Sequence, residues 1–449
     1  MNVDFTASIP LDDSHDVVVA GGGPAGCAAA LAAARRGKRT LILEAGTALG
    51  GMGTLGLVPA WCPFSDKEKI IYRGIAQEIF EDVKQGMAHI KKDAADWVPI
   101  DPEYYKRVLD KKVSEAGVDV LFGQTVISAA VDVLPGGQKR VSHIAAAYKG
   151  SLRAYAANVF IDSTGDADLT ASAGFPTLYG DGETEEVQPA THCFMLSNVD
   201  EYHYHSDPVM QSVENLKPVS SAISNSGKYP LFKQHAFNHS PLGPGTVGFN
   251  AGHLWQTDPR DPYAYSASYM RGRELAHQLH EGLKEYLPHI FGASFLAQTA
   301  PAMGIRESRR IVGDYTLTVE DYLGRKTFSD EIGRNCYYLD VHLTEEESER
   351  VLAGKKVKDG SEQYMPGESH GLPRGMLAVA GAQNLLAAGR NVSCDRRVQG
   401  SIRVMPVCLV MGQAAGTWAA LAGKGKDLRE VEAKLLQTEL KKDGAFFSS

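Results

Sequence analysis

The sequence has few cysteines, and none of them are paired along the chain. Six cysteines occur among 449 residues, and no two form a C-x-x-C arrangement. That absence argues against redox dithiols, zinc ribbons and ferredoxin-type clusters, so we expect no metal site. The first residues also lack the cationic start and apolar core of a secretory signal. We therefore expect free, buried thiols and a cytoplasmic protein.

Positive charge and long apolar runs are scarce as well. Lys and Arg number 46 against 54 Asp and Glu, which gives a formal net charge of −8. A nucleic-acid binder is expected to have a basic surface instead. No apolar run reaches the roughly 18 residues that cross a bilayer, and residues 404–422, the most apolar stretch, are interrupted by Pro406 and glycines. We expect no nucleic-acid partner and no membrane span.

Glycine, by contrast, is abundant, and one glycine cluster stands between a β-rich run and an Ala-rich helix former. Gly21, Gly23 and Gly26 form a G-x-G-x-x-G motif. The first glycine permits a tight turn, the second lets the backbone approach a pyrophosphate, and the third allows close packing of helix on strand. Glu44 ends the next strand, where a carboxylate suits an adenosine ribose and repels the 2′-phosphate of NADP. The pattern predicts a dinucleotide site at a helix N-terminus.

Three further glycine-centred segments favour FAD over NAD. Residues 50–54 (GGMGT) follow the second strand and leave backbone free to line a ribityl chain. Residues 163–166 (STGD) and the Gly389-Arg390 pair each follow an apolar strand, as similar segments do in FAD-dependent disulfide reductases. The likeness to those reductases implies that the N-terminus of the last helix, here near Val404 to Cys408, points at the flavin pyrimidine ring, which becomes negative on reduction.

Longer blocks of sequence carry a family resemblance. They are residues 17–56, residues 304–314 with 318–321, and residues 384–416. On these blocks the chain resembles FAD-dependent oxidoreductases of the glutathione-reductase-like flavoprotein superfamily, near the FAD domains of heterodisulfide reductases. Where such relatives often have a His after the G-R-x-x-S turn, this chain has Cys394 to Arg397, so no catalytic role is carried over to that loop.

Motifs and resemblance together predict an α/β fold, in which a doubly wound Rossmann-like FAD-binding domain is interrupted by an inserted, mostly-β substrate domain. Residues 1–174 and 373–449 are expected to form the FAD-binding domain, and residues 175–372 the substrate or cap domain. The residues predicted to hold the cofactor are Gly21, Gly23, Pro24, Ala25, Gly26, Glu44, Ala45, Gly51, Met52, Thr54, Val126, Asp166, Gly389, Arg390 and Arg403.

The candidate catalytic residues lie in the middle segment and just before the last expected helix. His253 is the candidate base, with a structural role as the alternative. Arg306 is expected to face the flavin or the substrate, and an ion pair with Glu307 is the alternative. Arg403 neutralises reduced flavin or an anionic substrate, and a pairing with Asp395 is the competing interpretation.

The expected activity is a dehydrogenase or oxidase that takes a hydride from a small polar organic molecule to flavin N5. Two alternatives stay open: a flavin monooxygenase using NAD(P)H and oxygen, and an electron-transfer subunit that serves a partner iron–sulfur protein. The sequence leaves open whether the electron acceptor is oxygen, a quinone or a protein, and whether the chain forms a homo-oligomer.

Overall fold

A five-stranded parallel sheet forms the centre of the computed structural model, which describes residues 6–180, 185–355, 357 and 362–448. Its strand order is β19-β8-β2-β3-β4. The strands are β2 (Val17–Ala20), β3 (Thr40–Glu44), β4 (Asp119–Phe122), β8 (Val159–Asp162) and β19 (Leu385–Ala387). All but the edge strand β4 are almost wholly buried, as a parallel sheet covered on both faces requires. The predicted α/β class with a Rossmann-like βαβ unit is confirmed.

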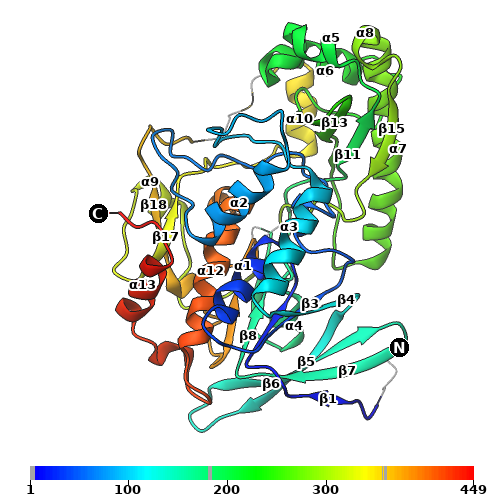
Figure 1. Cartoon of the computed structure of the whole chain (residues 1–449). Coiled ribbons are helices and arrows are strands. Elements are labelled where there is room, and N and C mark those ends of the chain that lie inside the picture. The colour runs from blue at the N-terminus through cyan, green and yellow to red at the C-terminus, as the bar shows by residue number, and fades with distance from the viewer. Residues whose placement is uncertain (1–5, 181–184, 356, 358–361, 449) are drawn as a thin grey trace.

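The two faces of this sheet have different covers (Figure 1). On one face, Val17 and Val19 pack into a core with α1 (Pro24–Ala34), α2 (Ile75–Gln85), α3 (Pro102–Glu115) and α12 (Met405–Leu421). On the other face, Val18 and Ala20 pack against a four-stranded sheet. That sheet has the order β1-β7-β6-β5 and is made of β1 (Leu11–Asp12), β5 (Thr125–Val133), β6 (Lys139–Tyr148) and β7 (Ser151–Ala156).

Glycines join the two ends of the chain at the contact between α1 and α12. A Cβ on Gly412 would lie 2.1 Å from the carbonyl oxygen of Ala25, and one on Gly416 would lie 2.0 Å from that of Ala29. Because no real side chain tolerates such distances, only glycine lets these two helices approach so closely. The C-terminal block is therefore part of the same core as the N-terminal glycine turn.

The middle of the chain adds a further sheet, which is antiparallel and has its own core; it is drawn in green at the top of Figure 1. Its order is β12-β13-β11-β15, from β11 (Phe194–Ser197), β12 (Asn238–Gly243), β13 (Thr246–Asn250) and β15 (Phe295–Thr299). Helices pack with it: α5 (Glu201–Ser206), α6 (Val213–Asn225), α7 (Pro262–Tyr286), α8 (Pro288–Phe291) and α10 (Glu345–Leu352). The inserted segment is thus mixed α and β rather than mostly β as expected.

Shorter elements complete the chain. The helices are α4 (Asp168–Ser172), α9 (Val319–Leu323), α11 (Arg396–Ile402) and α13 (Ala433–Lys442), with 3-10 turns η1 (Gly51–Gly53), η2 (Pro208–Gln211), η3 (Arg374–Met376) and η4 (Leu428–Glu430). The strands are β9 (Thr177–Tyr179), β10 (Ala190–Thr191), β14 (His253–Leu254), β16 (Arg309–Ile311), β17 (Glu331–Asn335) and β18 (His370–Pro373). All six cysteines are free, as predicted, and Cys62 and Cys336 are the two that are only partly buried.

Within the described ranges no single helix is long and apolar enough to cross a membrane, although α11 and α12 together, bent by 92°, meet that test by length and composition.

Candidate active site

A large cavity lies between the parallel sheet and the inserted segment. Its volume is about 1460 Å³, above the roughly 300–1000 Å³ of a pocket for one drug-sized ligand. It therefore has room for a dinucleotide and a second molecule. The predicted residues in its wall are Gly21, Gly23, Pro24, Ala25, Glu44, Ala45, Gly51, Met52, Val126, Asp166, His253, Arg306, Gly389, Arg390 and Arg403. Gly26 and Thr54 are not part of that wall.

The glycine turn has the shape that a pyrophosphate needs. Gly21 has a φ of +98°, and a Cβ there would lie 2.3 Å from the carbonyl oxygen of Ser163. A Cβ on Gly26 would lie 1.9 Å from the carbonyl oxygen of Gly21, so this glycine serves helix packing. A Cβ on Gly23 would meet nothing within 4 Å. The bare backbone at Gly23 thus faces open space in the cavity wall.

Two long helices begin at this cavity without side-chain caps. The N-cap of α1 is Gly23 and that of α12 is Val404, and neither makes a side-chain capping hydrogen bond. Both N-caps line the cavity. Uncapped N–H groups and the positive ends of the helix dipoles favour anionic groups at both places. The start of α1 suits a pyrophosphate, and the start of α12 suits the electron-rich edge of a reduced flavin ring.

Glu44 lines the cavity at the end of β3. Its Oε2 accepts a hydrogen bond from the Gly22 N–H at 2.6 Å, and its Oε1 accepts one from the Gly46 N–H at 2.6 Å. Burial raises the pKa of this carboxyl above its ordinary value, against the effect of these two bonds. Each oxygen keeps a further acceptor site, which suits a ribose diol. The carboxylate thus lies in the cavity wall at the end of β3, and its contact with a ribose stays a prediction.

Thr54 has a different role from the one expected. Its side chain is fully buried, and its hydroxyl donates to the carbonyl oxygen of Leu49 at 2.6 Å. The side chain therefore fixes the loop that carries Gly51 and Met52 into the cavity wall instead of lining the cavity itself.

The S-T-G-D and Gly389-Arg390 segments are joined by an ion pair that the sequence did not predict. Arg390 Nη2 donates to Asp166 Oδ1 at 2.8 Å, and the buried Arg390 Nε has no hydrogen-bond partner. Gly165, with a φ of +84°, leaves the space that this guanidinium fills, because a Cβ there would lie 2.6 Å from Arg390 Nη1. These segments are 224 positions apart and meet across the sheet between β8 and β19.

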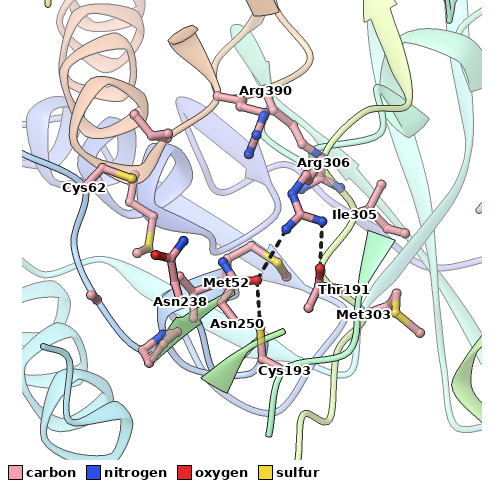
Figure 2. A pocket seen from close by; sticks show the side chains of 18 of the residues that line it. Met52, Cys62, Thr191, Cys193, Asn238, Asn250, Met303, Ile305, Arg306 and Arg390 are labelled. Atoms are coloured by element: carbon pink, nitrogen blue, oxygen red, sulfur yellow. Dashed lines mark hydrogen bonds between the residues drawn. The ribbon is translucent and has the colours of Figure 1, made fainter. Parts of the chain in front are cut away.

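Arg306 also lines the cavity, and its guanidinium points toward Thr191 and Asn250 (Figure 2). Its Nη1 donates to the carbonyl oxygen of Pro189 and to Thr191 Oγ1, both at 2.7 Å, and its Nη2 donates to Asn250 Oδ1 at 3.4 Å. Burial lowers its pKa to about 10, so the side chain stays cationic at neutral pH.

The pairing of Arg306 with Glu307, one alternative from the sequence, does not occur among the described residues. Glu307 accepts instead from Arg310 at 2.9 Å and from Arg396 at 3.3 Å.

A chain of ionisable side chains lies beside Arg306 in the cavity wall. Arg403 Nη2 donates to Asp340 Oδ2 at 3.0 Å. His342 Nε2 lies 3.6 Å from Asp340 Oδ1, and His342 Nδ1 lies 3.0 Å from His253 Nε2. The competing pairing of Arg403 with Asp395 is wrong, because Asp395 caps α11.

Burial sets the protonation of the two imidazoles. It lowers the pKa of His342 to about 4 and that of His253 well below its ordinary value, so both rings are neutral at pH 7. Burial alone would raise the pKa of Asp340, but its interaction with His342 and the charges of Arg403 and Arg306 hold it below its ordinary value. His253 Nδ1 is buried without a hydrogen-bond partner. Asp340 and His342 carried no motif by which the sequence would have shown them.

Comparison with known proteins adds the family. The FAD dependent oxidoreductase family matches residues 16–440. A search of curated proteins gives no match. Among solved structures, a geranylgeranyl bacteriochlorophyll reductase-like protein of Thermoplasma acidophilum is 12% identical, with a TM-score of 0.44, over 97% of this chain and 83% of that one. The flavin-dependent brominase Bmp2 is 10% identical, with a TM-score of 0.46, over 95% and 83%. THI4 of Thermovibrio ammonificans is 21% identical, with a TM-score of 0.29, over 36% and 64%.

Proposed function

Because the chain belongs to the FAD dependent oxidoreductase family, we propose that it oxidises a small polar organic molecule by hydride transfer to the flavin. One observation carries the proposal. A single cavity is lined both by the open dinucleotide turn at Gly23 and by the buried polar cluster of Arg306, Asp340 and His342. Cofactor and substrate would thus share one enclosed space, as hydride transfer requires.

The residues present fit FAD. Gly23 and the start of α1 would hold the pyrophosphate, Glu44 the adenosine ribose, and the start of α12 the electron-rich edge of the ring. Gly51 and Met52 in the cavity wall, together with the Asp166–Arg390 pair, would line the remainder. When bound, FAD supplies the acceptor for the hydride.

The chain itself has to take up a proton. A substrate that loses a C–H bond as hydride also loses a proton from O–H or N–H as its new double bond to carbon forms. His342 is neutral at pH 7 and lines the cavity. A proton accepted at its Nε2 is stabilised by Asp340, 3.6 Å away, and His253 fixes the ring from the other side at 3.0 Å. We assign the base role to His342, and a positioning role to His253, because His253 Nδ1 is enclosed.

The test uses purified holoprotein under argon. We expect a visible flavin spectrum that a panel of small alcohols, amines and their acids bleaches, and a reduction rate that falls at least tenfold in His342→Gln. His277→Gln, on the exposed side of α7, is the matched control and is expected to behave like the wild type. A colourless protein that does not take up FAD would contradict the proposal. Rapid bleaching by NAD(P)H alone, with no response to the panel, would favour a monooxygenase.

A further inference from the structure

Arg306 is a buried charge that forms no salt bridge with an acid of the described chain; Asp340, which acts on it at longer range, is itself paired with Arg403. Its residue exposure is only 9%, and all three of its hydrogen bonds go to neutral oxygens, on Pro189, Thr191 and Asn250. Removing a charge from water without a counter-ion costs several kcal/mol. Burial accordingly lowers its pKa, yet only to about 10, so the charge persists at neutral pH.

The other two arginines of the cavity differ in this respect. Arg390 pairs with Asp166 at 2.8 Å, and Arg403 pairs with Asp340 at 3.0 Å. The cavity wall around Arg306, Arg403 and Asp340 therefore holds two cations and one anion, with both neighbouring imidazoles neutral. This part of the site has an excess of one positive charge.

The free donors of Arg306 have the geometry of a carboxylate fork. A guanidinium has five N–H donors. Nη1 uses both of its hydrogens and Nη2 uses one. Nε–H and one Nη2–H therefore make no hydrogen bond within the described chain, on a residue that lines the cavity. Two parallel donors of this kind bind a carboxylate in a bidentate manner.

We infer that the substrate is a small carboxylic acid whose carboxylate pairs with Arg306. The inference rests on the proposed function and names the substrate class of that site. The partners of Arg306 belong to the inserted segment, and Thr191 and Asn250 lie beside its guanidinium in Figure 2. The turn and the start of α1 already provide for the pyrophosphate, so the anion at Arg306 is a second molecule. A carboxylate held there would lie on the same wall as His342.

The first test compares charged ligands with neutral counterparts of similar shape. Acetate, pyruvate and benzoate are titrated into the holoprotein, with acetamide and benzamide as controls, and binding is followed by flavin absorbance and by thermal shift. We expect at least one carboxylate to bind ten or more times more tightly than its amide. Arg306→Gln should remove that preference, while Arg325→Gln, which breaks an exposed pair with Glu368, should keep it.

A second variant covers the case in which Arg306→Gln does not fold. Asn250→Asp places a carboxylate where the amide oxygen now accepts from Arg306 at 3.4 Å. An internal counter-ion of this kind should weaken binding of the carboxylate tenfold or more and raise the melting temperature, with Arg306 still in place.

The outcomes separate the two proposals. The inference would be overturned, with FAD binding unaffected, if the carboxylates bound no more tightly than their amides. It would also be overturned if they bound to Asn250→Asp as tightly as to the wild type. A variant at Arg306 that changes FAD affinity or flavin potential but leaves the carboxylate preference intact would assign this cation to the flavin and also overturn it. The thermal-shift measurement does not depend on the flavin, so a protein without FAD would contradict the proposed function and still test Arg306.

Discussion

Replacing Gly23 with alanine should separate cofactor binding from folding. The backbone at Gly23 has φ −67° and ψ −177°, which alanine adopts without strain, and a Cβ there meets nothing within 4 Å. The lost freedom of the unfolded state stabilises a chain by about 0.4–1 kcal/mol, but Gly23 is the N-cap of α1, where alanine is less favourable than glycine by a similar amount. The free energy of unfolding should therefore stay within about 1 kcal/mol of that of the wild type. The same methyl group occupies the space that the pyrophosphate needs.

The expected loss of affinity follows from that overlap. Forcing an extra methyl group into a close contact costs about 1–3 kcal/mol, which corresponds to roughly 5- to 150-fold weaker FAD binding at about 1.4 kcal/mol per tenfold. Apoprotein stability is measured by urea denaturation, and FAD affinity by titration of flavin fluorescence.

Gly243→Ala is the matched control, because a Cβ at Gly243 also meets nothing within 4 Å and Gly243 does not line the cavity. The reasoning would be refuted if Gly23→Ala bound FAD as tightly as Gly243→Ala, or if it lowered the free energy of unfolding of the apoprotein by more than about 1 kcal/mol.

Other perturbations test the rest of the structure. Gly412→Ala should lower the free energy of unfolding by about 1–3 kcal/mol or more, since its Cβ would lie 2.1 Å from the Ala25 carbonyl oxygen; urea denaturation without a loss would contradict that contact. Glu44→Gln replaces one carboxylate oxygen, which accepts from the Gly22 or Gly46 N–H, by an NH₂ donor. Loss of a hydrogen bond to a charged group costs about 1.5–3 kcal/mol, so FAD binding should weaken about 10- to 100-fold. Fluorescence titration measures this affinity. His342 has a folded pKa of about 4 against about 6.5 unfolded, so the unfolded chain binds more protons between these values and stability falls as the pH is lowered from 6.5 to 4. His342→Gln should flatten that slope, and an unchanged slope in pH-dependent denaturation would show that the ring is not buried neutral.

Local backbone requirements were the part of the site that the sequence predicted well. Gly21 and Gly26 sit where a Cβ would strike a carbonyl oxygen, and Glu44 ends the neighbouring strand with its carboxylate in the cavity wall. These features depend on a few consecutive residues, so spacing alone determines them.

Contacts between distant segments were beyond the sequence. Arg403 and Asp340 are 63 positions apart and Arg306 and Asn250 are 56 apart, and no local pattern pairs them. His342 lies in a loop before α10, outside any motif. In the inserted segment, Pro218 lies inside α6. Since proline in a helix interior normally ends the helix, the local sequence does not indicate that α6 continues through this residue.

The seam of glycines between α1 and α12 also bears on when the cofactor enters during biosynthesis. The start of α12 forms one wall of the cavity, and Gly412 and Gly416 hold that helix against α1. When the ribosome has translated the glycine turn near Gly23, only one wall of the cavity has been made, because the start of α12 is encoded almost 400 codons downstream. Loading of FAD is accordingly a late event, which follows translation of the C-terminal helix.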